Sequence, residues 1–153
     1  MKTTQDVLSA KLLISLASGA KMPTYATEDS SGADIYAFLP DSDFILESGA
    51  FAMIPTGIKM EICSGYEVQI RPRSGLSAKY GITVLNSPGT IDADYRGEVR
   101  VILINHGNIP FTIEHGSRIA QMVLSKTHKA EFTLSKELNN TSRGEGGFGS
   151  TGT

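Results

Sequence analysis

Two apolar, β-branched runs flank a long segment of turn-forming residues, and this arrangement constrains the fold of the chain most. The runs are residues 82–85 and 99–104, and the segment 86–98 between them is crowded with Asn, Ser, Pro, Gly and Asp. Apolar runs bounded by turn formers predict a β-hairpin with a long, irregular tip. A tip of about two residues would suffice to reverse the chain. The longer tip therefore indicates either a binding or catalytic loop or an Asp-rich, solvated turn.

Short β-prone runs, separated by turn formers, make up most of the remaining sequence. Many short strands with one short helix predict an all-β fold, an antiparallel β-sandwich or barrel. The only predicted helix is 74–80, with Ser74 as its cap and Gly81 at its end. The run 99–104 is apolar at nearly every position, which predicts a subunit interface as well as a core. The other predicted strands are 12–16, 33–38, 44–46, 51–54, 58–62, 66–70, 111–113 and 119–124.

Length and composition indicate one globular domain of 153 residues. We expect a disordered extension at 1–10, a β domain at 11–138 and a flexible tail at 139–153. The net charge of −2 argues against a nucleic-acid partner. Cys63 is the single cysteine, so no internal disulfide is possible and a reducing compartment is favoured. No stretch reaches transmembrane length. We therefore expect a cytoplasmic protein without a membrane or nucleic-acid partner.

The start of the predicted helix and the C-terminal tail are candidate anion sites. A helix N-terminus offers free backbone N–H groups, and Arg73 and Ser74 would add a charge and a hydroxyl for phosphate. The alternative is that Ser74 simply caps the helix. In the tail, successive glycines allow backbone amides to converge on an anion, and Phe148 could stack on a flat base. The alternative there is a flexible tail with an incidental phenylalanine.

Asp34 and Gln121 are polar residues within apolar runs. Each could point to solvent, or could orient a water or a hydrated Mg²⁺ ion held largely by substrate phosphates. Arg118, three residues before Gln121, is equally ambiguous.

Five stretches, taken together, resemble the five motifs of the homotrimeric dUTPases of bacterial type, in type, order and approximate spacing. The resemblance implies a jelly-roll-like β fold, the dUTPase-like β-clip. It also implies a homotrimer with three shared active sites, and Mg²⁺-dependent hydrolysis of dUTP to dUMP and pyrophosphate. Such an activity supplies dUMP for dTTP synthesis and keeps uracil out of DNA. The stretches are residues 31–37, 71–81, 86–99, 116–124 and 143–152.

Carried over by position, the resemblance implies a role for each candidate residue. Asp92 would be the catalytic general base that polarises a water for attack on the α-phosphorus. Tyr95 would pack against deoxyribose and leave no room for a 2′-hydroxyl. Asp34 and Gln121 would hold waters around Mg²⁺ and the phosphates. The remaining residues would bind substrate in three groups. The uracil would be bound by Asn86, Gly89, Thr90, Ile91 and Arg100, and the phosphates by Arg73, Ser74 and Gly75. The γ-phosphate and base would be covered by the closing tail, through Arg143, Phe148, Gly149, Ser150 and Thr151.

Two other functions remain compatible with the same scaffold. One is a nucleotide enzyme related to the dCTP deaminases, which use a catalytic Glu in a different local pattern. The other is a non-catalytic, nucleotide-sensing trimer, which would need no residue to activate water. The segment 92–99, DADYRGEV, favours the dUTPase pattern over both.

Overall fold

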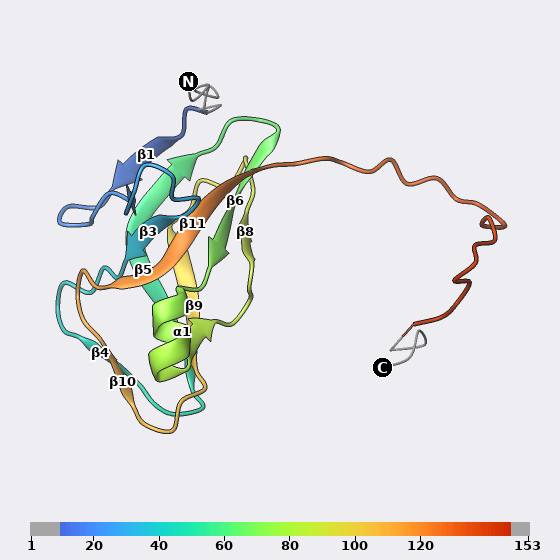
Figure 1. Cartoon of the computed structure of the whole chain (residues 1–153). Coiled ribbons are helices and arrows are strands. Elements are labelled where there is room, and N and C mark those ends of the chain that lie inside the picture. Colours follow the sequence, from blue (N-terminus) through green and yellow to red (C-terminus); the bar gives the residue numbers. More distant parts are fainter. Residues whose placement is uncertain (1–9, 148–153) are drawn as a thin grey trace, which may run out of the picture.

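A computed structural model describes residues 10–147, which form a mostly β structure with one short helix in that range (Figure 1). The all-β prediction is therefore confirmed. The elements are β1 (Leu13–Leu16), β2 (Thr24–Tyr25), β3 (Ala33–Tyr36), β4 (Phe44–Leu46), β5 (Phe51–Glu61), β6 (Tyr66–Arg71), α1 (Ser74–Tyr80), β7 (Ile82–Val84), β8 (Gly89–Ile91), β9 (Val99–Asn105), β10 (Phe111–Ile113) and β11 (Arg118–Lys126).

Two antiparallel sheets enclose a single apolar core. One sheet has the strand order β1-β5-β9-β7 and the other β2-β3-β11-β6-β8, while β4 and β10 form a separate pair. Ile54 and Leu103 come from the first sheet and Val68 from the second, and all three belong to one buried cluster. Each strand thus gives one face to the core and leaves the other to carry binding groups or to meet another chain.

The central hairpin is present, but its tip is not a simple loop. Strand β7 pairs with β9 in the register Val84 to Leu103, as the two flanking runs predict. The tip, however, contains β8, which pairs with β6 in the opposite sheet. The chain therefore crosses between the sheets within the tip, and this crossing places residues 90–95 at the edge of the molecule.

The prediction of two separate strands at 51–54 and 58–62 is wrong, because one strand, β5, covers Phe51–Glu61. The residues interpreted as a turn form a bulge, where the pairing with β9 shifts between Pro55 and Ile58. Gly57 adopts a left-handed φ of 67°, and the Thr56 hydroxyl donates to the Val99 carbonyl at 2.6 Å. Strand β5 advances three residues where β9 advances one, so it carries two extra residues, Thr56 and Gly57. Extra residues on one strand, with a glycine at positive φ among them, are typical of a β-bulge.

Helix α1 has the predicted bounds, but Ser74 is not its cap. Arg73 occupies the N-cap position in an extended conformation, and no side chain bonds to the first helical N–H groups. Gly81 ends the helix with a left-handed φ of 70°, as predicted. The hydroxyl of Ser74 is therefore not used for capping.

Beyond β11 the chain leaves the body as an extended arm, residues 127–147, which Figure 1 shows running away from both sheets. Its large apolar side chains are bare: Phe132 is 94%, Leu134 99% and Leu138 88% exposed. The predicted boundaries at residues 10 and 138 stay predictions, because residues 1–9 and 148–153 lie outside the described part. No helix in the described part is long and apolar enough to cross a membrane.

Candidate active site

One candidate cavity, which we call the Tyr95 cavity, lies where the hairpin tip meets the outer face of β5 and β9. Its volume is about 450 Å³. Apolar side chains of the two strands form one wall, and the polar residues of the tip form the other. The lining residues are Met53, Thr90, Ile91, Asp92, Tyr95, Glu98, Arg100 and Ile102.

Asp92 and Asp94 differ in which hollow they reach. Asp92 lines the Tyr95 cavity and also borders a neighbouring, more polar hollow. Asp94 borders only that second hollow, together with Arg96. Of the two candidate carboxylates, Asp92 is therefore the one that shares a cavity with the tyrosine.

The charged residues of the Tyr95 cavity are held by one another and by the backbone. Arg100 Nε donates to Glu98 Oε2 at 3.0 Å, and the other carboxylate oxygen accepts from the Gly57 N–H at 3.0 Å. The Tyr95 hydroxyl donates to the Glu98 carbonyl at 3.0 Å. Glu98 thus links the tip to the bulge of β5, which fixes the position of the tip over the strands.

A second cavity, the Asp34 cavity, lies where the ends of β3 and β11 meet the start of α1. It has a volume of about 320 Å³ and is mostly polar. Its functional groups come from three of the five motif stretches, residues 31–37, 71–81 and 116–124. The pairing of Gln121 with Asp34 and with Arg71 brings these stretches together. The lining residues are Ala26, Ser30, Ser31, Gly32, Asp34, Arg73, Ser74, Gly75, Arg118 and Gln121.

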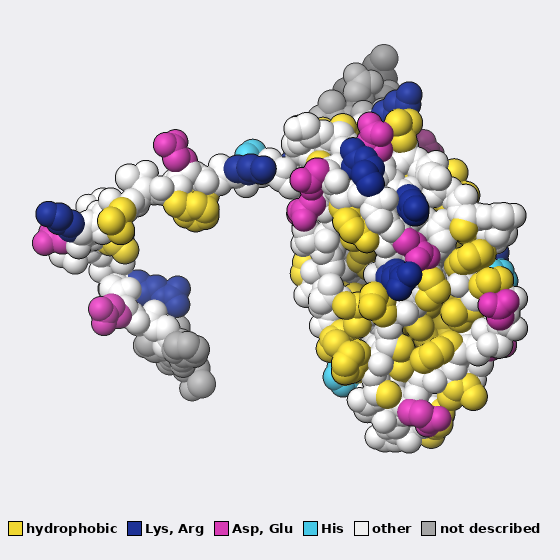
Figure 2. Space-filling view, turned by 180° about the vertical axis from the view of Figure 1, so that it is seen from behind, with side chains coloured by type: hydrophobic (Ala, Val, Ile, Leu, Met, Phe, Trp, Pro, Cys, Tyr) yellow, Lys and Arg dark blue, Asp and Glu magenta, His cyan; other side chains and the backbone are white. Residues whose placement is uncertain are grey.

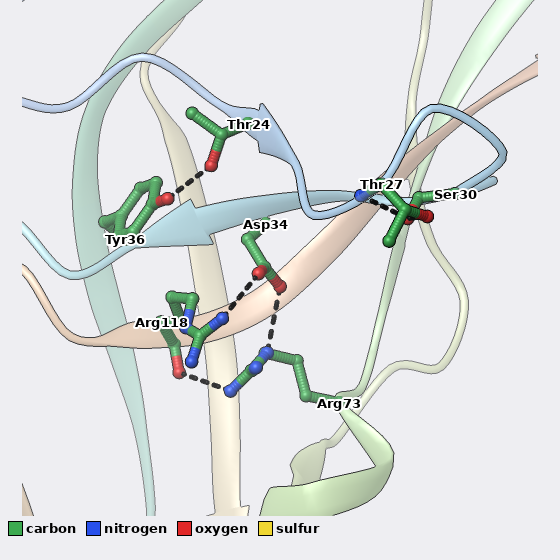
Figure 3. A network of polar contacts seen from close by, with 7 residues as sticks. All are labelled: Thr24, Thr27, Ser30, Asp34, Tyr36, Arg73 and Arg118. Atoms are coloured by element: carbon green, nitrogen blue, oxygen red, sulfur yellow. Dashed lines mark hydrogen bonds and ion pairs between the residues drawn. The ribbon is translucent and has the colours of Figure 1, made fainter.

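Asp34 accepts hydrogen bonds from two arginines, as Figure 3 shows. Arg73 Nε lies 2.9 Å from Oδ1 and Arg118 Nη1 lies 3.3 Å from Oδ2. The Asp34 side chain is 14% exposed and that of Arg118 52%. Arg73 also donates to the Arg118 carbonyl at 3.4 Å. A mostly buried carboxylate therefore holds two guanidinium groups at the rim of the cavity, in an arrangement suited to an anionic ligand.

Gln121 and the start of α1 complete the Asp34 cavity. The Gln121 amide donates to the Pro72 carbonyl at 3.0 Å, which ties β11 to the turn before the helix. Ser74 and Gly75 form the first helical turn, and a Cβ built on Gly75 would meet nothing within 4 Å. The backbone there is open to a ligand.

The structure gathers the predicted residues into two groups. Asp92, Tyr95, Thr90, Ile91 and Arg100 line the Tyr95 cavity, whereas Asp34, Arg73, Ser74, Gly75 and Gln121 line the Asp34 cavity, and the two linings share no residue. Asn86 lies against Gly89 outside both linings. Arg143 lies on the arm, where it donates to the Gly146 carbonyl. Phe148, Gly149, Ser150 and Thr151 fall outside the described residues.

Sequence reasoning missed several cavity residues. Met53 and Ile102 line the Tyr95 cavity because they are direct partners across β5 and β9, a pairing that no local pattern reveals. The motifs predict no role for Glu98, although it is an acidic residue three positions after Tyr95. The sequence leaves the role of Arg118 ambiguous, and only its contact with Asp34 places it in a site.

Comparison with known proteins shows the family of the chain. A dUTPase family model matches residues 18–152. The chain belongs to the dUTPase family. It is 57% identical over 131 residues to a deoxyuridine 5'-triphosphate nucleotidohydrolase of Roseobacter denitrificans, covering 86% of each chain. It is 51% identical over 154 residues to the protein of that name from Ehrlichia canis, covering 99% of each.

A solved dUTPase confirms the fold. A mutant dUTPase of Staphylococcus bacteriophage 80alpha, solved with dUpNHpp, superimposes with a TM-score of 0.84. The match covers 95% of this chain and 100% of the other, at 26% identity. These matches confirm the family resemblance that the five motifs indicate. They also confirm the predicted dUTPase fold.

Proposed function

We propose that this chain hydrolyses dUTP to dUMP and pyrophosphate. The observation that carries the proposal is the 51% identity to a deoxyuridine 5'-triphosphate nucleotidohydrolase over 99% of both chains. The two cavities suit the two ends of such a substrate. One combines apolar strands, a tyrosine and a carboxylate, and the other combines arginines with an open helix start.

The nucleoside would occupy the Tyr95 cavity. Tyr95 packs against the deoxyribose, and the backbone of 89–91 with Asn86 and Arg100 reads the uracil. Asp92 accepts a proton from the water that attacks the α-phosphorus, since it is the carboxylate that shares this cavity with the sugar-facing tyrosine. A positioned base of this kind contributes about 10²- to 10⁴-fold to a rate.

The triphosphate would occupy the Asp34 cavity, with Arg73, Ser74 and Gly75 holding its oxygens. The donor set fits Mg²⁺ held mainly by phosphates and water, because Asp34 supplies one carboxylate and Gln121 one amide. Within residues 10–147, no three His, Cys, Asp or Glu side chains cluster to hold a metal by themselves. When bound, Mg²⁺ supplies positive charge to the phosphate oxygens, and Asp34 and Gln121 orient waters around it.

A homotrimer would bring the separate cavities together, with three active sites shared between subunits. The outer face of β5 and β9 supports this assembly. Phe51 is 65% and Met53 58% exposed, opposite Ile104 and Ile102 in the register. Figure 2, the view from behind, shows apolar side chains gathered on one face of the body. A contiguous apolar face of this kind is typical of an interface between subunits.

The arm supports the same assembly. The side chains of Phe132, Leu134 and Leu138 are exposed, and the arm that carries them runs away from the body (Figure 1). Burying them on a second copy would offset the cost of ordering the segment. An arm that crosses to a neighbour would carry Arg143 and the tail beyond it to a site on that neighbour.

Pyrophosphate and ammonia release from dUTP, dTTP, dCTP and UTP would test the activity. We expect pyrophosphate from dUTP, with the other three turned over poorly. In this proposal the hairpin backbone excludes a 5-methyl group and Tyr95 excludes a 2′-hydroxyl group. Ammonia from dCTP would indicate the deaminase alternative, and binding without turnover would indicate the sensor. Comparable kcat/KM values for dUTP and UTP would contradict the role of Tyr95.

Mixed trimers would test the shared site. One variant lacks residues 141–153, the other carries Asp92→Asn, and the two are unfolded and refolded together. Random 1:1 assembly makes about three quarters of the trimers mixed, each with one working site in three, so about a quarter of full activity should return. Separately refolded variants, mixed afterwards, are the control. No recovery in mixed trimers, verified by native mass spectrometry, would mean that each tail closes over its own subunit.

A further inference from the structure

The ring of Tyr95 lies in the space that a side chain at position 97 would fill. A Cβ built on Gly97 would lie 2.5 Å from Cζ and 2.9 Å from Cε2 of this ring, and nearer still to the hydroxyl. Unbonded carbon atoms pack at about 3.5–4.0 Å. The tyrosine can therefore adopt its observed position only because residue 97 has no side chain.

The backbone at Gly97 does not itself require glycine. Among residues 10–147, the glycines with a left-handed φ are Gly19, Gly49, Gly57, Gly65, Gly81, Gly116 and Gly144, and Gly97 is not one of them. An alanine could adopt the same φ without strain. The three atoms that a Cβ at this position would approach most closely all belong to Tyr95, so a substitution here acts first on the tyrosine.

The hydroxyl end of the ring is fixed as well. It donates to the Glu98 carbonyl at 3.0 Å, so the side chain reaches across Gly97 from residue 95 to residue 98. Tyr95 lines the cavity and Gly97 does not, which places the ring between the glycine and the ligand space. Any atom added to Gly97 pushes the ring by about 1 Å from this position.

We infer that Gly97 is a positioning residue that seats Tyr95 against the backbone and thereby sets the choice between 2′-deoxyribose and ribose. The inference rests on the proposed function, since it assigns the Tyr95 cavity to the nucleoside. It adds a second residue to sugar selection, one that touches no substrate and acts through the ring. A shift of about 1 Å in a site can change a rate by about 10²-fold.

Gly97→Ala, Tyr95→Ala and the double variant test this in the full-length protein. We expect Gly97→Ala to lower the ratio of kcat/KM for dUTP over UTP by at least about tenfold, mainly through a higher KM for dUTP. In the Tyr95→Ala background the same substitution should change the ratio by less than about twofold, because the ring that it displaces is gone. Binding of dUMP and UMP, measured by calorimetry, should show the same coupling without catalysis.

Tyr95→Phe keeps the test decisive if Gly97→Ala fails to fold. The ring retains its seat on Gly97 and loses only the bond to the Glu98 carbonyl, so the ratio should stay within about threefold of wild type. A loss as large as that of Tyr95→Ala would mean that the hydroxyl, not the glycine, positions the ring. Equal effects of Gly97→Ala with and without the tyrosine would overturn the inference too. A wild-type protein that does not turn over dUTP would instead contradict the proposed function.

Discussion

The Tyr95 cavity and the Asp34 cavity hold their key side chains in different ways. Tyr95 is fixed by contacts with neighbouring backbone, across Gly97 and onto the Glu98 carbonyl. Asp34 is fixed by charge, between the guanidinium groups of Arg73 and Arg118. A site fixed by shape distinguishes ligands by their outline, whereas a site fixed by charge holds any ligand with the same anionic group. Selectivity should therefore depend on the first cavity, and the second should act equally on all triphosphates.

The largest expected loss of activity follows substitution of Asp92, and it should affect the chemical step without affecting phosphate binding. Asp92→Asn preserves the shape of the Tyr95 cavity but removes the group that accepts a proton, so kcat for dUTP should fall at least about 100-fold. Affinity for a non-hydrolysable dUTP analogue, measured by calorimetry, should be retained. Asp94→Asn is the matched control, because Asp94 does not line this cavity. The opposite pattern would mean that Asp94 is the base.

The next largest loss of activity should follow substitution of Asp34, and it should leave the selectivity for dUTP over UTP unchanged. Asp34→Asn leaves both arginines charged but removes the anion that orients them. A hydrogen bond to a charged group contributes about 1.5–3 kcal/mol, which corresponds to a loss of about 10- to 100-fold in kcat. The dUTP/UTP ratio should stay within about twofold of wild type. Asn at the exposed Asp41 is the control. A changed ratio would show that the two cavities are not separate in function.

The contrast between the cavities also explains what the sequence could predict. Local patterns located the helix and most strands, since capping and alternation are encoded by neighbouring residues. They could not reveal that Asp34 bonds to Arg73, 39 positions away, and to Arg118, 84 positions away. These contacts depend on which strands pair, and pairing is decided by the packing of the whole core.

Individual glycines and helix caps also show that local sequence does not determine the role of a residue. Thr56-Gly57 gives the same local signal for a turn and for a bulge, and only the continued pairing of β5 with β9 distinguishes them. Ser74 is a favoured capping residue, yet Arg73 takes that position, and its side chain extends to Asp34 instead of capping the helix. Likewise, sequence alone does not separate Gly57, needed for its φ, from Gly97, needed for the space above it.

A smaller effect should follow from Gly32, which seats Gln121 as Gly97 seats Tyr95. A Cβ on Gly32 would lie 2.9 Å from Gln121 Cδ, so Gly32→Ala should rotate the amide away from the Pro72 carbonyl. One neutral hydrogen bond contributes about 0.5–1.5 kcal/mol, so kcat/KM for dUTP should fall about two- to tenfold. Adding Gly32→Ala to Gln121→Ala should have no further effect. An additive loss would indicate that Gly32 acts on the backbone instead.

The smallest loss of activity should follow substitution of Arg118. The salt dependence of this loss distinguishes the Asp34 cavity, fixed by charge, from the Tyr95 cavity, fixed by shape. Its side chain is 52% exposed, and its carbonyl, which accepts from Arg73, survives any substitution. An exposed ion pair contributes about 0.2–1 kcal/mol, so Arg118→Gln should lower kcat/KM for dUTP by no more than about fivefold, and Arg118→Lys by less.

Screening should remove that loss, because the Debye length falls to about 3 Å at 1 M salt. The ratio of Arg118→Gln to wild type should therefore approach one as NaCl is raised, for dUTP and UTP alike. The ratio of Gly97→Ala to wild type should not change over the same series, since a steric displacement is not screened. A loss in Arg118→Gln that exceeds tenfold and persists at high salt would mean that Arg118 binds the substrate directly instead of holding Asp34.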